Sequence, residues 1–523
     1  MVFPQPGQRV TAGESPDALM NERSAGAAVA GPGAFERSDR TILLVILAVS
    51  ALLRLPGIWQ FEVWQDEIYS IYEARDLIHS PFGPGGMELR PLYLLALHPL
   101  TMMAPRAIVL LRLPSLIFGL LGIAATWSLA YRNLGRNAAL VAAGVLAVLP
   151  LHINASQIIR YWSLIYLLGA LYAGALLQAL ASDRRRDHLM VLLWLLLGTL
   201  THPTFAITAV GMTLAAHLVR NDGGFGWRWP TSGAWRLTWV PAVVLLLLFY
   251  AGLWLFFTTE RLVGEAAGSP ERLVPALAFN LSPALVTASA LGVLCLVTRR
   301  DAITRRFGLM GTLGALVSVA TLFVGGTLRF LPVSVLYVSA AFPLLVSAAG
   351  ALPSCFATTA PARRRAAVAL LLVLVAGLAP STVSHLNDGS RFDYRPALGR
   401  VQAVDPGGTV VLWPLVQATW AAPGLKGVEL RSSTTVSLFD SLLAARDRYW
   451  VITSRRRYGL IGDADGRKQQ WLSRHCDRIL TTARPRYDFE EYVAMLWECR
   501  AGGPSSIKAA QPGQDARPLP DRD

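Results

Sequence analysis

Between residues 41 and 385 the chain is dominated by apolar runs that are long enough to cross a membrane. An α-helix needs about 20 mostly apolar residues to span roughly 30 Å of hydrocarbon. The runs that meet this requirement are 41–58, 108–131, 137–153, 158–181, 188–202, 203–219, 238–257, 276–298, 307–324, 330–351 and 366–385. The pattern predicts an all-α polytopic membrane protein with about eleven transmembrane helices.

The composition agrees with this class. Of the 523 residues, 53% are hydrophobic and only 16% are charged, whereas soluble domains carry about 25% charged residues. The mean hydropathy of +0.42 excludes a single water-soluble globule. A net charge of +14 would suggest nucleic acid in a soluble protein, but no zinc-finger, RRM or helix-turn-helix pattern is present. We therefore expect no nucleic-acid partner and attribute the charge to cytoplasmic loops.

Arginine placement predicts the orientation, because cytoplasmic loops of membrane proteins carry the excess of Lys and Arg. The clusters Arg184–Arg186 and Arg363–Arg365 fall on the same side as the N-terminus if segment 91–105 does not cross. That segment is short for a span and contains three prolines, so we interpret it as an interfacial or re-entrant piece on the outer side. The prediction is a multi-pass protein of the cell inner membrane, with a cytoplasmic N-terminus and an extracytoplasmic C-terminus.

The regions outside the apolar part differ from it in composition. The first 40 residues are rich in Gly, Ala, Pro and Ser and lack a signal-peptide cleavage site, which predicts a disordered cytoplasmic tail. After residue 385, short β-rich runs at 409–414, 448–454 and 492–499 alternate with polar, helix-like stretches. The predicted domains are a tail (1–40), a transmembrane module (41–385), a small extracytoplasmic α/β domain (386–500) and a second disordered tail (501–523).

The first candidate site is the outer loop 59–107, which contains an Asp66–Glu67 pair. From residue 91 to residue 182 there is no Asp or Glu, so a carboxylate for acid–base work in this half must come from the loop. The pair opens a predicted amphipathic helix, where the helix dipole favours the ionised form. An ionised carboxylate at the membrane face is able to take a proton from an acceptor hydroxyl. The alternative is that both acids only favour a helix start.

The second candidate is the segment HINASQIIRYW (152–162), which lies between two apolar helices. It contributes His152, Gln157, Arg160 and Tyr161. Polar side chains at membrane depth are costly unless they line a pocket or a pathway. The alternative is a snorkelling Arg160 with an interfacial Tyr–Trp belt.

Four further residues map to the same outer face: Arg90, His202, Arg261 and Arg329. Each alone is explained by a structural or snorkelling role. Together, cationic residues beside a carboxylate pair suit an anionic, lipid-linked substrate. We predict phosphate binding by Arg160, Arg90 and Arg329, and other substrate contacts by His152, Gln157, Tyr161, His202 and Arg261.

The four cysteines show no spacing typical of a metal site. Cys476 and Cys499 both fall in the predicted outer domain, where an oxidising compartment permits a disulfide. The sequence leaves open whether these two residues form a bridge or two buried thiols.

Several motifs occur in an order that resembles a known family. They are WQDE (64–67), PLY (91–93), RLPSLIFGLLG (112–122), YRNLGRNAAL (131–140) and SQIIRYW (156–162). Over residues 41–350 the chain resembles the GT-C glycosyltransferases of the PMT-2, or protein-O-mannosyltransferase-like, group. This group includes the lipid A aminoarabinose transferases and the Rgt-type lipopolysaccharide sugar transferases.

The resemblance implies a polyprenyl-phosphate sugar donor used on the outer membrane face, with long outer loops at 59–107 and 258–275. It matches Asp66 to the family's catalytic acid, with Glu67 beside it, and Arg160 to the arginine of an S-Q-x-x-R element. Two positions depart from the family pattern: Ile158 replaces a frequent Glu, and Arg90 replaces a frequent Pro.

The function that these features predict is inverting glycosyl transfer from a polyprenyl phosphate to a lipid, polysaccharide or protein acceptor. Asp66 would act as general base, and the arginines would hold the leaving phosphate. Phosphate is a good leaving group, so no metal or other cofactor is expected. The alternatives are a transporter or flippase of lipid-linked sugars, and a non-catalytic envelope assembly protein. A transporter favours charged or discontinuous helices near mid-membrane, and no Asp or Glu lies within a predicted span.

Overall fold

The computed structural model describes part of the chain. The described residues are 37–77, 90–227, a few single residues between 233 and 251, 273–327, 334–387, 389, 394–413, 429–432, 437–456, 459–460, 466–485 and 491–501. Arg261, Arg329, nearly all of loop 258–275, most of the predicted 238–257 span and most of both predicted tails lie outside these residues.

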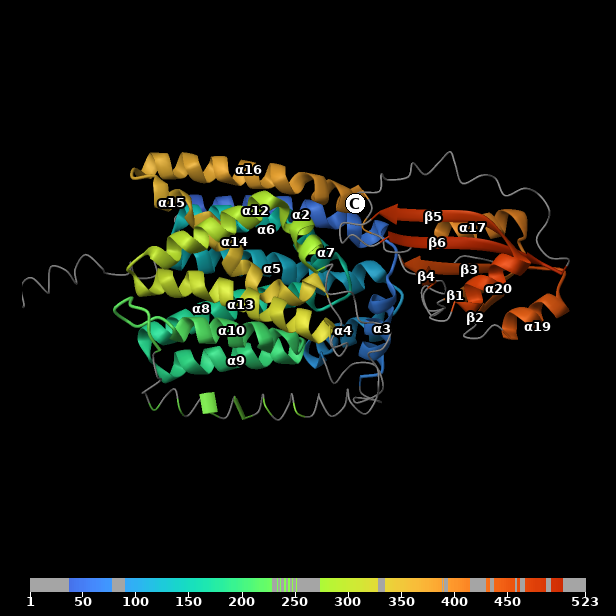
Figure 1. Cartoon of the computed structure of the whole chain (residues 1–523), viewed down its shortest axis with the longest axis horizontal. Coiled ribbons are helices and arrows are strands. Elements are labelled where there is room, and N and C mark those ends of the chain that lie inside the picture. The colour runs from blue at the N-terminus through green and yellow to red at the C-terminus, as the bar shows by residue number, and fades with distance from the viewer. Residues whose placement is uncertain are drawn as a thin grey trace, which may run out of the picture. The chain divides into compact units, whose positions relative to one another are not determined.

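A helical part precedes a small sheet domain, which confirms the predicted fold class (Figure 1). Its helices are α2 (Arg37–Gln60), α3 (Gln65–Arg75), α4 (Pro91–Met103), α5 (Ile108–Leu134), α6 (Arg136–Val148), α7 (Pro150–Gln157), α8 (Trp162–Ser182), α9 (Arg185–Thr201), α10 (Thr204–His217), α12 (Leu273–Thr298), α13 (Ala302–Thr327), η3 (Val335–Ala341), α14 (Phe342–Ala351), α15 (Pro353–Phe356) and α16 (Ala360–Asn387).

The predicted number of spans is not confirmed. Within the described residues, seven helices are long and apolar enough to cross a membrane, or eight if the bent pair α6–α7 is one span. The runs 188–202 and 203–219 form α9 and α10, which have 17 and 14 residues. At 1.5 Å per residue, a helix of 14 residues reaches only about 21 Å, which is short of a full crossing. The protein is nevertheless an integral membrane protein by the length and composition of its helices.

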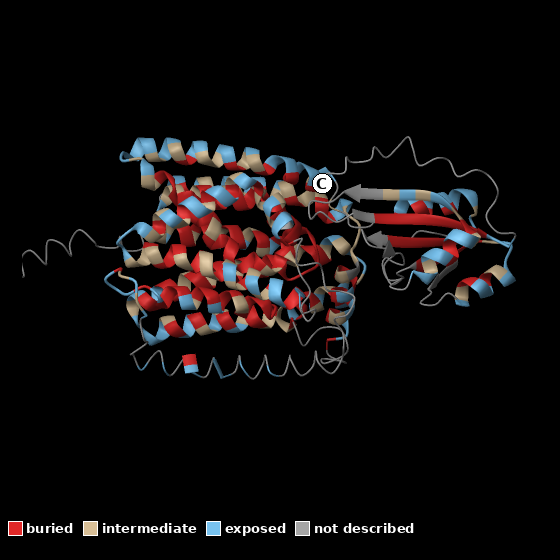
Figure 2. Cartoon of the chain, viewed as in Figure 1, coloured by how far each residue is buried: buried red, intermediate tan, exposed pale blue. Residues whose placement is uncertain are grey.

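Burial differs strongly between the candidate spans. Figure 2 shows α16 largely exposed, whereas much of α14 is buried. Large apolar side chains remain exposed on the outer helices, for example Leu52 on α2 and Leu372 on α16. Exposed apolar surface of this extent is unusual for a soluble protein. We interpret these faces as lipid contacts.

Glycines allow α7 to pack closely against α2 and α5. A Cβ at Gly57 would collide with the side chain of Gln157, and a Cβ at Gly119 would collide with that of Ser156. Small residues at such contacts let helices approach one another in a membrane. The two glycines therefore let α7 lie close to both helices.

The helix break between α6 and α7 has a specific cause. The two helices meet at an angle of 59°. Pro150 has no N–H, so the carbonyl of Leu146 loses its normal partner four residues on. The guanidinium of Arg54 on α2 donates to the carbonyls of Leu146 and Ala147 at 3.2 and 2.9 Å. A cation at the C-terminus of α6 also suits the helix dipole. Arg54 thus stabilises the break.

The C-terminal domain is a mixed sheet with helices on both faces. The strands are β1 (Thr409–Trp413), β2 (Glu429–Ser432), β3 (Arg448–Arg456), β4 (Gly459–Leu460), β5 (Cys476–Pro485) and β6 (Glu491–Arg500), and the helices are α17 (Arg395–Val404), α19 (Ser437–Ala445) and α20 (Arg467–His475). The strand order is β2-β1-β3-β6-β5, with β4 paired to β3. β1 pairs in parallel with β2 and β3, and the β3–β6 and β5–β6 pairs are antiparallel.

Alternation along the strands explains this layering. Successive side chains of a strand point to opposite faces. Val410 and Leu412 are buried in one cluster with residues of α17. Val411, between them, is buried in a second cluster with residues of α19 and α20. The sheet therefore has an apolar core on each face.

Two cysteine pairs lie within bonding distance. Cys476 and Cys499 face each other on β5 and β6 and form a disulfide, which answers the question that the sequence leaves open. Cys295 on α12 and Cys355 on α15 form the second pair. By the predicted topology this second pair lies at the cytoplasmic end, where thiols normally stay reduced. We expect only the Cys476–Cys499 bridge to persist in cells.

Candidate functional site

Helix α3 carries three polar side chains on one face. Asp66, Ser70 and Glu73 are spaced by four and three residues, so they lie one above another along the helix. Ile68 and Ile71 are buried and fix the helix on its apolar side. The sequence pattern of this short helix therefore places two carboxylates and a hydroxyl on one face, where they contact Arg160 and Arg90.

Asp66 and Arg160 form the centre of the site. The Oδ2 atom of Asp66 lies 3.4 Å from Nη2 of Arg160, and the Asp66 side chain is 36% exposed. Arg160 also donates from Nη1 to the backbone carbonyl of Asp66 and to the hydroxyl of Ser70, both at 3.1 Å. Arg160 is thus held in place, while the Asp66 carboxylate remains accessible.

Glu67 is buried and fully occupied. Its side chain is 0% exposed and forms an ion pair with Arg112 of α5, from Nε to Oε1 at 2.9 Å and from Nη2 to Oε2 at 3.0 Å. It also accepts the N–H groups of Trp64 and Ile159, both at 2.8 Å. These partners occupy the buried carboxylate within the protein. The contacts favour a positioning role for Glu67 over the predicted catalytic role.

The Glu67–Arg112 pair joins four parts of the chain. Arg112 donates from Nη1 to the carbonyls of Gly57, Ile58 and Phe61 at the end of α2. Glu67 itself belongs to the first turn of α3, and its contact with the Ile159 N–H lies next to Arg160. One buried ion pair therefore sets the position of Asp66 and of Arg160 together.

Arg90 pairs with the second carboxylate of α3. Its Nε and Nη2 atoms donate to Glu73 at 3.1 and 2.7 Å in a bidentate contact. Both side chains are largely buried, at 10% and 14% exposure. Burial raises the pKa of the Glu73 carboxyl above its usual range, although the Arg90 guanidinium opposes this shift. The structure thus places the predicted Arg90 at the site and adds Glu73, which the sequence prediction missed.

A stack of aromatic rings contacts Arg90 and Arg160. The guanidinium carbons of Arg90 and Arg160 lie 5.6 and 5.1 Å from the centre of the Tyr161 ring. The Tyr161 ring stacks on His202 at 4.6 Å, and His202 stacks on Tyr337 at 5.3 Å, both with planes at 16°. Cations over an aromatic face are attracted by its quadrupole. Tyr161 and His202 therefore join the site as predicted side chains, whereas Tyr337 was missed.

His152 and Gln157 belong to a different cluster. His152 contacts Arg54, with 2.7 Å between Nδ1 and Nη2. Gln157 donates to the carbonyl of Arg54 at 2.9 Å and pairs with His385 of α16 at 2.7 Å. Both side chains are almost fully buried. Their contacts tie α7 to α2 and α16, and the substrate contacts expected of His152 and Gln157 stay a prediction.

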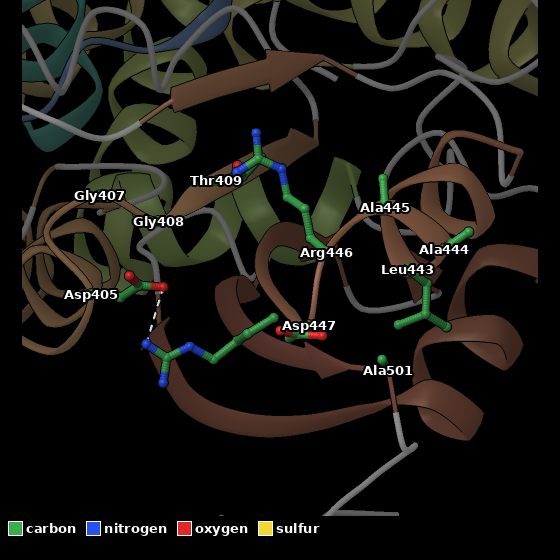
Figure 3. A pocket seen from close by; sticks show the side chains of 11 residues that line it. Asp405, Gly407, Gly408, Thr409, Leu443, Ala444, Ala445, Arg446, Asp447 and Ala501 are labelled. Atoms are coloured by element: carbon green, nitrogen blue, oxygen red, sulfur yellow. Dashed lines mark ion pairs between the residues drawn. The ribbon is translucent and has the colours of Figure 1, made fainter.

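The described residues also contain a separate hollow in the C-terminal domain (Figure 3). It has a volume of about 480 Å³ and is lined by charged residues that include Asp405, Arg446 and Arg448. An ion pair of 3.1 Å joins Asp405 and Arg448. The hollow lies where β1 and β3 begin, whereas open α/β sheets usually bind ligands at the carboxyl ends of parallel strands. None of its residues was predicted as a site residue.

Among the described residues, no group of three or more His, Cys, Asp or Glu side chains is placed to hold a metal ion. The charged groups gathered around α3 are the carboxylates of Asp66, Glu67 and Glu73 and the guanidinium groups of Arg90, Arg112 and Arg160. We call Asp66, Glu73, Arg90 and Arg160, together with the Tyr161 ring that both arginines contact, the α3 cluster.

Comparison with known proteins supports the predicted resemblance. The family model described as dolichyl-phosphate-mannose-protein mannosyltransferase matches residues 91–255. The chain resembles this family of glycosyltransferases. The matched region is less than half of the chain and includes Arg112, Arg160, Tyr161 and His202, while Asp66 precedes it. This similarity to the mannosyltransferase family indicates a transferase of sugars.

Two solved structures are also similar to the chain. One is ArnT from Cupriavidus metallidurans in the apo state, with 14% identity, 86% of this chain and 97% of that chain covered, and a TM-score of 0.48. The other is ArnT from the same organism bound to undecaprenyl phosphate, with 13% identity, the same coverage and a TM-score of 0.49. No curated protein matched the chain.

Proposed function

We propose that the protein is an inverting membrane glycosyltransferase that moves a sugar from a polyprenyl phosphate to an acceptor hydroxyl outside the cytoplasm. The observation that carries this proposal is the contrast within the Asp66–Glu67 pair. The Asp66 carboxylate is accessible beside the buried Arg160, whereas Glu67 is buried and holds both in place. Such an arrangement suits one general base next to one anion-binding group.

The reaction follows from these positions. Asp66 takes the proton of the acceptor hydroxyl, and the oxygen forms a bond to the anomeric carbon of the sugar. The bond from that carbon to the phosphate oxygen breaks, and its electron pair stays on the phosphate. Arg160, with Arg90 nearby, balances the charge that develops there. Cations already in place at such a charge stabilise the transition state without reorganisation.

A polyprenyl-phosphate donor is supported by chemistry and by the family similarity. Arginine binds phosphate through its planar fork of N–H donors, and two arginines face one aromatic ring in the α3 cluster. The family model that matches the chain is named for a dolichyl-phosphate sugar donor. The residues predicted as phosphate ligands on sequence alone include Arg90 and Arg160, which lie together.

A transporter would be expected to use the broken helix α6–α7 to bind an ion. Broken transmembrane helices of transporters leave carbonyl groups to coordinate ions. The break between α6 and α7 has such carbonyls, but Arg54 occupies those of Leu146 and Ala147. We therefore favour the enzyme over the transporter or flippase. The accessible Asp66 carboxylate beside Arg160 favours the enzyme over a non-catalytic assembly protein.

The proposed orientation makes a direct prediction. Alkaline phosphatase fused after residue 501 should be active, because the C-terminal domain is placed outside the cytoplasm. The same reporter fused after Arg300, between α12 and α13, should be inactive and serves as the matched control. Peptide mapping of alkylated protein should show Cys476 linked to Cys499. An inactive fusion after residue 501 together with free thiols at both cysteines would reverse the orientation.

The proposed donor site predicts a loss of phosphate-lipid binding in Arg160→Ala. Removal of a charge-assisted contact to phosphate should weaken binding of undecaprenyl phosphate by about tenfold or more. Binding is measured on purified full-length protein by native mass spectrometry or by thermal stabilisation. Arg299→Ala is the control, since that exposed guanidinium donates to the carbonyl of Ser354. Equal affinity of both variants for the lipid would remove Arg160 from the proposed donor site.

A further inference from the structure

Arg90 already has an anionic partner in the α3 cluster. Its Nε–Nη2 edge makes the bidentate contact with Glu73. This edge is one that arginine also uses to bind a phosphate bidentately. A phosphate that binds Arg90 in this way has to displace Glu73.

The reaction changes how strongly a phosphate competes for Arg90. The donor is a phosphodiester with one negative charge, whereas the released polyprenyl phosphate is a monoester whose second pKa is about 6. When Asp66 takes the acceptor proton, one negative charge moves from Asp66 to the phosphate. Arg160 then loses its charged neighbour, and the product binds the arginines more strongly than the donor did. Product release is therefore the step that a competing carboxylate would assist.

We propose that Glu73 is a positioning residue that withdraws Arg90 from the phosphate after transfer and thereby speeds the release of polyprenyl phosphate. This inference rests on the proposed glycosyltransferase function. Glu73 lies on the same face of α3 as Asp66, so both carboxylates respond to the same phosphate. Asp66 takes the proton, and Glu73 forms its ion pair with Arg90 again.

The charges around the Glu73–Arg90 ion pair support a contact that a phosphate is able to replace. Burial raises the pKa of Glu73 even though Arg90 and Arg160 lower it. The attraction of the arginines therefore does not fully offset the cost of burying this carboxylate. A contact of this kind holds Arg90 in the absence of substrate, yet a phosphate is able to replace it.

The test is the affinity for product in Glu73→Gln. Removal of the competing charge should tighten binding of undecaprenyl phosphate on the order of tenfold. Steady-state turnover should fall by more than the single-turnover rate, because the slower step is the release of product. Asp76→Asn is the matched control, since it removes one negative charge from the exposed end of the same helix. Glu73→Ala also removes the charge and is expected to act in the same direction if Glu73→Gln does not fold.

A purely structural role of Glu73 predicts the opposite result. If Glu73 only holds Arg90 ready for the phosphate, its removal weakens product binding, and that outcome overturns the inference. Unchanged product affinity in both Glu73 variants overturns it as well. Failure of the proposed function is distinguishable, because the unmodified protein would then neither bind undecaprenyl phosphate nor transfer a sugar.

Discussion

Asp66→Asn should lower the turnover of sugar transfer by about 10² or more. The amide keeps the shape of the side chain but does not accept a proton from the acceptor. Binding of undecaprenyl phosphate should be largely kept, because Arg160 retains its contacts with Ser70 and with the Asp66 carbonyl. Transfer is measured in membranes at matched amounts of protein.

The alternative explanation of Asp66 gives a different result. If the residue only favours the start of α3, Asp66→Asn changes stability by a few tenths of a kcal/mol, since Asn is nearly as good near a helix start. Transfer would then be near normal, and the proposed mechanism would be wrong. Asp76→Asn controls for the loss of one charge on α3 and should leave turnover unchanged.

The second large effect is expected at Arg112, which has no direct part in the chemistry. Arg112→Met leaves the Glu67 carboxylate buried without its cation. Breaking a buried ion pair in this way costs about 3–5 kcal/mol. We expect little folded protein in the membrane and a large drop in the midpoint of thermal unfolding in detergent. Arg132→Met, at the exposed end of the same helix, is the control.

A double variant separates the effect of the unpaired Glu67 charge from the effect of the lost contacts. In Arg112→Met combined with Glu67→Leu, no uncompensated charge remains, so stability should be partly restored. Activity should not return, because the contacts from Glu67 to Ile159 and from Arg112 to the end of α2 are also lost. A single variant Arg112→Met that is as stable as the Arg132→Met control would contradict the role of this pair.

The sequence predicted the sheet domain well because its signal is local. The three predicted β-rich runs correspond to β1, β3 and β6. Alternation of Val410, Val411 and Leu412 between two buried faces needs only neighbouring residues to be recognised. The strand order, in contrast, depends on contacts between distant segments, which a single sequence does not show.

The transmembrane part was predicted as a class, and the predicted number of spans is not confirmed among the described residues. The sequence prediction treated 137–153 as one continuous span although it contains Pro150. A proline inside a helix removes a backbone hydrogen bond. The stretch after it forms α7 and packs against α2 and α5 through glycine contacts. Apolar length alone does not distinguish a crossing helix from a shorter, bent or partly inserted one.

The sequence analysis named Asp66 and Arg160, which the structure brings together, but it did not identify the residues that hold them in place. Asp66 and Arg160 lie 94 positions apart and are brought together by α3 and the α7–α8 junction. The sequence alone does not distinguish the role of Glu67 from that of Asp66, because the ion-pair partner of Glu67, Arg112, is 45 positions away along the chain. One signal was present: Arg112 and Arg54 are arginines next to or within apolar runs, and such residues are rarely without a role.

The contact from Glu67 to the backbone beside Arg160 has a consequence for how this protein diversifies. In the proposed mechanism, Asp66 activates the acceptor and Arg160 receives the leaving phosphate, and both groups are held by the contacts of Glu67. Substitutions in the surrounding loops are then able to change the sugar or the acceptor while the spacing of the reacting groups stays constant.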